Sequence, residues 1–429
     1  MIRARHLCPT LMVALLTLPA AADEVVRAGG EFVVNATTSS DQGFPHVGTN
    51  GNGEFVVTWE SYGQDGDYFG VFGQQLDAAG QPVGGEFPVN TTTTANQWDP
   101  AVAVREDGSF VITWASFLQD GDGYGVFARR FDAAGMAVGG EIAVNSHTPA
   151  DQDFPDIAAG PDGGFLIVWE SAGQDMSFDG VYAQRYDAAG MAAGDEFRVN
   201  TTTLEEQDEA QVAAVSDGYL VVWESGGIDT SGDAVMIQRL DASGNAVGDE
   251  TQINTTFSND QEDPDVAVLP DGTYAVVWES DGQDGDGESV AGQVFASDGT
   301  AIGSEMLLNQ TITGNQDDPR IAAVGDDTFL VVWTSAAPGP SVADVFGRQV
   351  SATGDPVGDE FRINTSIDAP QDVPSVAGDP AGRAIAAWRA FGDHDGDAAG
   401  VLGQGFDLAF FFGGFEGGNT MEWTTSVGE

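Results

Sequence analysis

Seven tryptophans recur along this chain at nearly constant intervals. Successive members are 54 or 55 residues apart: Trp59, Trp114, Trp169, Trp223, Trp278, Trp333 and Trp388. An Asn series keeps the same spacing: Asn35, Asn90, Asn145, Asn200, Asn254, Asn309 and Asn364. A Gln series also keeps it: Gln42, Gln97, Gln152, Gln207, Gln261, Gln316 and Gln371. One structural unit is therefore copied seven times, and because no Pro- or Ser-rich linker interrupts the copies, we expect one body.

Each copy contains four short segments with strand character. In the second copy these are residues 100–104, 110–114, 124–132 and 141–145. The first two segments flank Asp107-Gly108, a hairpin turn in which Gly accepts a positive φ. Residues 110–114 are apolar on both faces, which is typical of a strand sandwiched between neighbouring layers. The sequence therefore predicts an all-β fold, a seven-bladed β-propeller of four-stranded blades.

The ends of the repeat array predict how the ring closes. A copy of the fourth strand, residues 31–35, precedes every first strand, and the last copy ends near Asp407 without a fourth strand of its own. We expect the N-terminal strand to complete the last blade, which also covers a strand edge that would otherwise be exposed. The alternative, an open array of β-sandwich units, gives no reason for this split.

Three segments divide the chain: a signal peptide over residues 1–22, the propeller over 23–408 and a C-terminal tail over 409–429. The first segment has a positive start, a short apolar stretch from Leu7 to Leu18 and small residues before Asp23. That apolar stretch is too short to span a bilayer as a membrane anchor. We expect a secreted or cell-surface protein that is not inserted in the membrane after the signal is removed.

The charge balance excludes two classes of partner. The 14 basic residues are all Arg, against 68 acidic residues, for a formal net charge of −54. A chain without a basic face does not bind nucleic acid through phosphates, nor anionic lipid by charge.

Acidic loops are the candidate metal site. Because strands alternate in direction, the loops between second and third strands leave the same face as the connections between blades. Closely spaced carboxylates there could converge on Ca²⁺, which takes several oxygen ligands. The candidate ligands are Asp65, Asp67, Asp120, Asp122, Asp284, Asp286, Asp393, Asp395 and Asp397. The last three flank His394 with one-three-five spacing but lack the Gly and Glu of an EF-hand; the alternative is a solvated acidic face.

The periodic residues themselves have a structural interpretation. We expect each Trp to pack between blades. A Glu begins each fourth strand and is expected on the outer rim or as the cap of a turn: Glu31, Glu86, Glu141, Glu196, Glu250, Glu305 and Glu360.

Three stretches of the second copy carry a family resemblance: 119–123 (Gln-Asp-Gly-Asp-Gly), 132–135 (Asp-Ala-Ala-Gly) and 138–141 (Val-Gly-Gly-Glu). They resemble a propeller-type repeat of secreted bacterial calcium-dependent and haemolysin-type surface proteins. The resemblance implies an extracellular propeller that binds or adheres; the haemolysin nonapeptide itself is not present. The segment 412–423 is similar to a short tail of exported bacterial proteins and is a candidate sorting or attachment signal.

These features favour a non-enzymatic binding or adhesion module, a monomer whose partner is an extracellular protein or glycan. All seven copies have similar chemistry, whereas an active site breaks symmetry, and no Gly-x-Ser-x-Gly elbow is present. Two alternatives stay open: a carbohydrate-active or other propeller hydrolase or lyase, and a structural cell-envelope protein. Carboxylates with raised pKa in a pocket would favour the enzyme.

Overall fold

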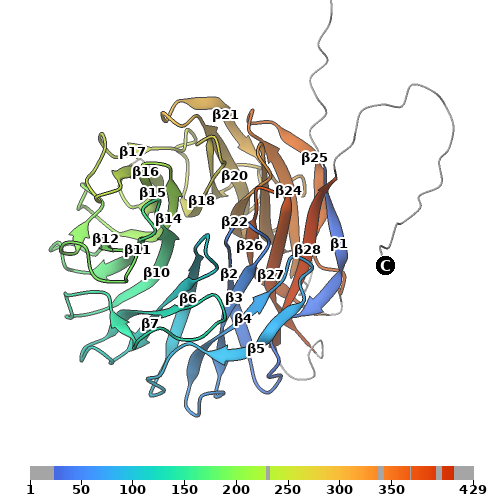
Figure 1. The fold of residues 1–429 in the computed structure, drawn as a ribbon. Coiled ribbons are helices and arrows are strands. Elements are labelled where there is room, and N and C mark those ends of the chain that lie inside the picture. Colours follow the sequence, from blue (N-terminus) through green and yellow to red (C-terminus); the bar gives the residue numbers. More distant parts are fainter. Residues whose placement is uncertain (1–23, 229–231, 337–342, 368, 393–398, 410–429) are drawn as a thin grey trace, which may run out of the picture.

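The chain forms a ring of seven four-stranded antiparallel sheets (Figure 1). The computed structural model describes residues 24–228, 232–336, 343–367, 369–392 and 399–409. This confirms the all-β, seven-bladed propeller. The predicted signal peptide and nearly all of the tail lie outside the described residues. Within the described ranges, no helix has the length and apolar character of a membrane span.

The strands occupy four concentric positions, and the innermost strands of adjacent blades contact each other around the axis. The innermost strands are β2 (Gln42–Thr49), β6 (Gln97–Val104), β10 (Gln152–Ala159), β14 (Gln207–Val215), β18 (Gln261–Val268), β22 (Gln316–Val324) and β26 (Gln371–Gly378). The second strands are β3 (Phe55–Tyr62), β7 (Phe110–Phe117), β11 (Phe165–Ala172), β15 (Gly218–Ser225), β19 (Tyr274–Asp281), β23 (Thr328–Ala336) and β27 (Arg383–Phe391). The third strands are β4 (Phe69–Leu76), β8 (Tyr124–Phe131), β12 (Asp179–Tyr186), β16 (Ala234–Asp241), β20 (Glu288–Phe295), β24 (Ala343–Ser351) and β28 (Ala399–Ala409). The outer strands are β5 (Pro82–Pro88), β9 (Ile142–Ala143), β13 (Phe197–Arg198), β17 (Thr251–Gln252), β21 (Ala301–Leu307), β25 (Pro356–Arg362) and β1 (Glu24–Val33).

We number the blades by their innermost strands, from blade 1 (β2) to blade 7 (β26). The outer strand of blade 7 is β1, which pairs antiparallel with β28 from Glu24↔Ala409 to Val33↔Leu402. Figure 1 shows the two ends of the colour scale side by side at this seam. The predicted closure of the ring by the N-terminal strand is therefore confirmed.

The core lies between the blades. All seven periodic Trp side chains are fully buried. Trp169 of blade 3, for example, shares an apolar cluster with Val111 and Val126 of blade 2. This confirms the expected packing, in which each large ring fills the space between two sheets.

The other periodic residues hold the blades by hydrogen bonds. In every blade the side-chain oxygen of the periodic Asn accepts the backbone N–H of a third-strand Val at 2.8–3.0 Å. Each outer-strand Glu accepts backbone N–H groups from the turn after the Asn of the preceding blade, as Glu250 does from Thr201 and Thr202. The Glu residues cap turns, as predicted. The repeated residues thus make repeated structural contacts.

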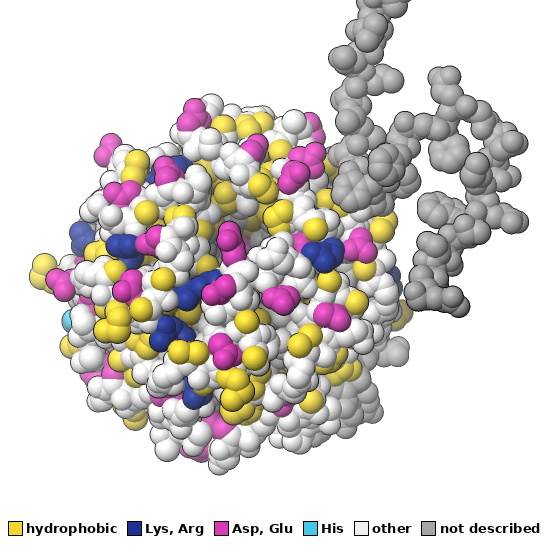
Figure 2. Space-filling model, viewed as in Figure 1, with side chains coloured by type: hydrophobic (Ala, Val, Ile, Leu, Met, Phe, Trp, Pro, Cys, Tyr) yellow, Lys and Arg dark blue, Asp and Glu magenta, His cyan; other side chains and the backbone are white. Residues whose placement is uncertain are grey.

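The ring has two faces. The hairpins between first and second strands leave one, the turn face; the loops between second and third strands leave the other, the loop face. In the view of Figure 2, Arg side chains lie among Asp and Glu side chains, so that surface carries mixed charge.

Candidate active site at the loop-face mouth of the channel

Every innermost strand carries a β-bulge near the loop face. The register shifts just after the residue that follows the periodic Gln, as between Gly43 and His46 in β2. The first bulge residue has a φ between 46° and 53° in each blade. These residues form the mouth ring: Phe44, Asp99, Phe154, Glu209, Asp263, Asp318 and Val373. Left-handed backbone is costly for residues other than Gly, and it clusters at functional sites.

Five members of the mouth ring line a hollow of about 120 Å³: Phe44, Asp99, Phe154, Glu209 and Val373. Two residues further along each strand, a second set faces the axis as the inner ring: His46, Ala101, Asp156, Gln211, Asp265, Arg320 and Ser375. Four of its members each accept a backbone N–H of the adjacent blade: Ser375 from Val47, His46 from Val102, Asp156 from Val212 and Asp265 from Ile321. The inner ring therefore joins neighbouring blades and is polar.

The ionisable residues of the inner ring are Arg320, His46, Asp156 and Asp265. The Nε2 atom of His46 lies 3.8 Å from an Asp156 carboxylate oxygen. Burial and the charge of Arg320 lower the pKa of His46 to about 4, so the imidazole is neutral at pH 7. Burial raises the pKa of Asp156 to about 7 and that of Asp265 to about 6.

Residues that directly follow the periodic Trp form hydrogen bonds with the mouth ring. These residues form the post-Trp ring: Glu60, Ala115, Glu170, Glu224, Glu279, Thr334 and Arg389. Three of the Glu residues accept the backbone N–H of a mouth-ring residue in the next blade: Glu60 from Asp99 at 2.8 Å, Glu170 from Glu209 at 2.6 Å and Glu279 from Asp318 at 2.5 Å. Burial raises the pKa of all four Glu residues. Repulsion from nearby carboxylates adds to the effect for Glu170, Glu224 and Glu279.

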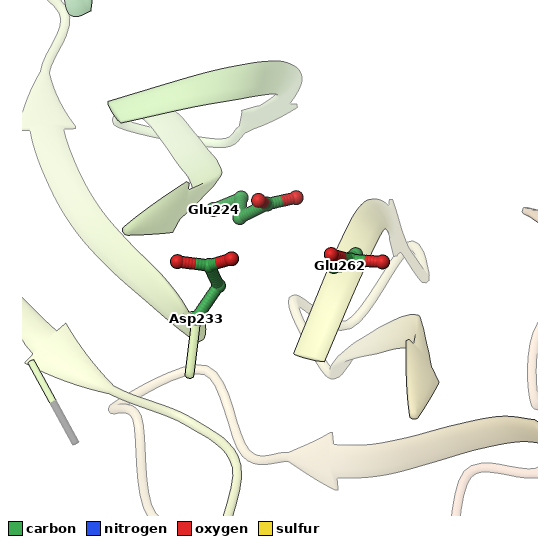
Figure 3. Close-up of side chains that lie close together, drawn as sticks. All are labelled: Glu224, Asp233 and Glu262. Atoms are coloured by element: carbon green, nitrogen blue, oxygen red, sulfur yellow. The ribbon is translucent and has the colours of Figure 1, made fainter. Parts of the chain in front are cut away.

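Three carboxyl groups between blades 4 and 5 form what we call the acid trio (Figure 3). Glu224 is the next-to-last residue of β15, Asp233 directly precedes β16, and Glu262 is the second residue of β18. One oxygen from each lies within 4.8 Å of the others, and the figure shows the three groups turned toward one space. All three side chains are half-buried, so a ligand can reach them.

The trio keeps a proton at neutral pH. Burial raises the pKa of Glu224 to about 10, helped by the negative charges of Asp208, Glu262 and Asp233. Burial also raises the pKa of Glu262 to about 7, with added repulsion from Asp260, Asp263 and Asp233. A protonated carboxyl beside a carboxylate can donate a proton while its neighbour attacks or accepts one.

Two further acidic groups continue the trio. One carboxyl oxygen from each of Glu262, Glu279 and Glu288 lies within 4.8 Å of the others. The same holds for Asp263, Glu279 and Asp318. Blades 4 to 6 therefore present one continuous acidic arc, whose carboxylate oxygens also suit a hard cation such as Ca²⁺.

The loop carboxylates predicted as calcium ligands have protein partners. Asp65, Asp120 and Asp284 each accept a hydrogen bond from the side-chain amide of the periodic Asn of the same blade. Asp67, Asp122 and Asp286 each accept a backbone N–H from the following blade connection. Among the described residues, none of these six belongs to the three groups that approach closely enough to share an ion. Calcium at these loops stays a prediction.

The third predicted set, Asp393, Asp395 and Asp397 with His394, lies outside the described residues. The acid trio and the mouth ring were missed by sequence reasoning. The signal that could have found them is variation: the positions after each Trp and two after each Gln differ between copies, whereas Trp, Asn, Gln and Glu repeat.

The sequence matches no protein-family model and no curated protein. Solved structures match in fold. A polysaccharide lyase has a TM-score of 0.54 and 12% identity, covering 90% of this chain and 100% of its own. A fungal alcohol oxidase has a TM-score of 0.55 and 10% identity, covering 90% and 76%. An α-L-arabinofuranosidase of Fusarium graminearum has a TM-score of 0.51 and 13% identity, covering 75% and 96%. At these identities the likeness shows the fold alone.

These comparisons overturn the prediction that the chain is not an enzyme. That prediction assumed that seven similar copies leave no place for an active site. The three structures named above are enzymes, and the axial residues of this chain break the sevenfold symmetry. The chain is a propeller of the architecture that hosts such enzymes, and function has to be argued from its site.

Proposed function

We propose that this protein is a carbohydrate-active enzyme that cleaves glycosidic bonds at the loop-face mouth of its channel. The acid trio carries the proposal, because it places a carboxyl that is protonated at neutral pH within 4.8 Å of two other carboxyls in a reachable site. Glycoside hydrolysis needs such a pair, one acid and one base or nucleophile.

The roles follow from the environments. Glu224 donates its proton to the glycosidic oxygen as the bond from that oxygen to the anomeric carbon breaks. Asp233 attacks the anomeric carbon, and water then releases the sugar while Glu224 recovers its proton. The close approach of the oxygens suits a retaining mechanism, in which the carboxyls stand about 5 Å apart, better than an inverting one, in which a water needs about 6.5 Å or more.

The fold supports the same proposal at a coarser level. The arabinofuranosidase and the polysaccharide lyase, which match this chain in fold, are by name enzymes that act on carbohydrates, and this supports the proposal. Polysaccharides are too large to enter a cell intact and are cleaved outside it. This agrees with the export expected from residues 1–22.

The test is release of reducing ends from a panel of arabinan, xylan, xyloglucan and mixed-linkage glucan by residues 23–429. We expect activity on at least one polymer and a loss of about 10²- to 10⁴-fold in kcat for Glu224→Gln. Glu106→Gln, an exposed acid on the turn face, is the matched control and should leave kcat unchanged. A folded wild type that is silent across the panel, or a fully active Glu224→Gln, contradicts the proposal.

We also propose that Ca²⁺ binds this face, either at the loop carboxylates or within the acidic arc. The close approach of three acidic groups favours the arc, since a cation would relieve their mutual repulsion.

A further inference from the structure

The mouth ring is chemically divided. Blades 4 to 6 contribute Glu209, Asp263 and Asp318, whereas blades 7, 1 and 3 contribute Val373, Phe44 and Phe154, and blade 2 places Asp99 between the two Phe residues. Phe44 is 41% exposed and Phe154 is 42% exposed. An exposed aromatic ring on left-handed backbone combines backbone strain with apolar exposure, a combination that folding alone does not favour.

The ring of Phe44 is held in place. The guanidinium of Arg389 lies 4.7 Å from the centre of the Phe44 ring and 4.9 Å from that of Phe391. Arg389 is itself fixed by two hydrogen bonds to Asp372, at 2.8 and 2.9 Å. One face of Phe44 is therefore covered by a cation, and the exposed part of the ring is presented in a defined orientation.

Aromatic residues continue outward from this side of the mouth. Trp98, next to Asp99 in β6, stacks on Tyr124 with ring centres 4.4 Å apart and an interplanar angle of 16°. Tyr124 also contacts Phe117 at 4.9 Å. The position of Trp98 is acidic in blades 3 to 7, where it is occupied by Asp153, Asp208, Glu262, Asp317 and Asp372. We call Phe44, Trp98 and Phe154 the aromatic arc.

The charge of the molecule restricts what can lie on this arc. The net charge of −54 repels anionic polymers. A neutral sugar chain is not repelled: its C–H faces stack on aromatic rings, and its hydroxyls form hydrogen bonds with carboxyl groups.

We propose that the aromatic arc is the binding platform for a neutral polysaccharide, whose sugar rings stack on Phe44 and Phe154 and lead the chain across the mouth to the acid trio. This inference rests on the proposed function for the direction in which the sugar chain runs. It adds the substrate class: uncharged glycans, as opposed to uronates or sulfated polymers.

The experiment measures binding without turnover. Glu224→Gln protein is titrated calorimetrically with arabinan, xyloglucan and mixed-linkage glucan, and with polygalacturonate as the anionic probe. Phe44→Val and Phe154→Val are added singly and together. Val occupies the equivalent left-handed position as Val373 in blade 7, so the backbone tolerates it. Met191→Val, at a side chain 66% exposed on the turn face, is the matched control.

We expect a neutral polymer to bind, each Phe substitution to weaken binding about threefold to tenfold, and the control to bind as the parent does. Unchanged binding in the double Phe variant overturns the platform, as does the absence of binding to every neutral polymer. Preferential binding of polygalacturonate overturns the substrate class. An active Glu224→Gln enzyme whose Phe variants still lose affinity refutes the trio and leaves the platform standing, so the two failures are distinguishable.

Discussion

A carboxyl oxygen of Glu170 in blade 3 accepts the backbone N–H of Glu209 in blade 4 at 2.6 Å, which places two acidic residues in one partly buried contact. Burial raises the pKa of Glu170 well above its usual range, and the charges of Glu209 and Asp208 raise it further. The same contact recurs as Glu60 with Asp99 and Glu279 with Asp318. The mouth is therefore built from carboxyl groups that resist ionisation.

The first prediction concerns stability and pH. These carboxyls bind protons more tightly in the folded chain than in the unfolded chain. Their stabilising contribution is therefore complete below about pH 4.5 and is lost as pH rises through their folded pKa values, from about 7 for Glu262 to about 10 for Glu224. We expect the melting temperature to fall between pH 6 and pH 9. The variant Glu224→Gln/Glu262→Gln should show a shallower fall by calorimetry, and an equal or steeper fall would contradict the assignment.

The second prediction concerns the alkaline limit of activity. The proton donor Glu224 has a pKa of about 10, so activity should persist to about pH 9 and decline above it. The charge of Asp208 is the largest electrostatic contribution to that pKa after burial. Asp208→Asn should therefore move the alkaline limb of kcat/KM to lower pH. Asp195→Asn, an exposed acid away from the trio, should leave the limb in place.

The third prediction separates packing from hydrogen bonding at the periodic tryptophans. Trp388 Nε1 donates to Gln371 at 2.7 Å, whereas Trp169 Nε1 is buried without a hydrogen-bond partner within the described residues. Both rings are fully buried. Trp388→Phe should cost about 1 kcal/mol more in free energy of unfolding than Trp169→Phe, measured by urea denaturation, because it also removes the buried hydrogen bond from Nε1 to Gln371. Equal costs would show that the hydrogen bond adds nothing to stability.

The fourth prediction concerns the seam between β1 and β28. Removing residues 24–35 deletes the outer strand of blade 7 and the Asn35 oxygen that accepts the Val401 N–H. We expect the truncated chain to associate through the exposed edge of β28 and to melt at lower temperature. Size-exclusion chromatography with light scattering tests this, with the chain beginning at residue 23 as control. A monomeric truncated protein of unchanged stability would contradict it.

The fifth prediction locates the calcium. At fixed ionic strength, Ca²⁺ at a hundred times its Kd should stabilise the protein by about 2.7 kcal/mol relative to chelator. Loss of that gain in Asp263→Asn/Asp318→Asn, which keeps the proton donor Glu224, places the ion in the acidic arc. Loss in Asp120→Asn/Asp122→Asn or in Asp393→Asn/Asp395→Asn/Asp397→Asn places it in the loops. Identical melting with Ca²⁺, Mg²⁺ and chelator would refute calcium binding.

The fold could be predicted because the residues that recur in sequence make the contacts that recur in space. Trp169 fills the space between two sheets, Asn145 accepts from Val126, and Glu250 caps the turn of the preceding blade. The site could not be predicted in the same way. Glu224 sits at one varying position of the repeat, and its raised pKa depends on burial and on carboxyls from its own blade and the next. The loop aspartates drew attention by their spacing, but Asp120 and Asp122 are tied to Asn145 and Ala150.

The offset closure has a consequence for how the array grew. A sequence copy that runs from an outer-strand Glu to the next third strand spans the seam between two blades. Its Glu caps a turn of the preceding blade, and its Asn binds the third strand of the blade to which that Glu belongs, as Glu250 and Asn254 do. Duplication of such a copy therefore duplicates an interface together with the strands, and every new chain carries from the outset the contacts that join its blades. Rings with one copy more or fewer would inherit the same interlocked seam, so the number of blades could change during evolution without any blade having to acquire a new neighbour-binding surface.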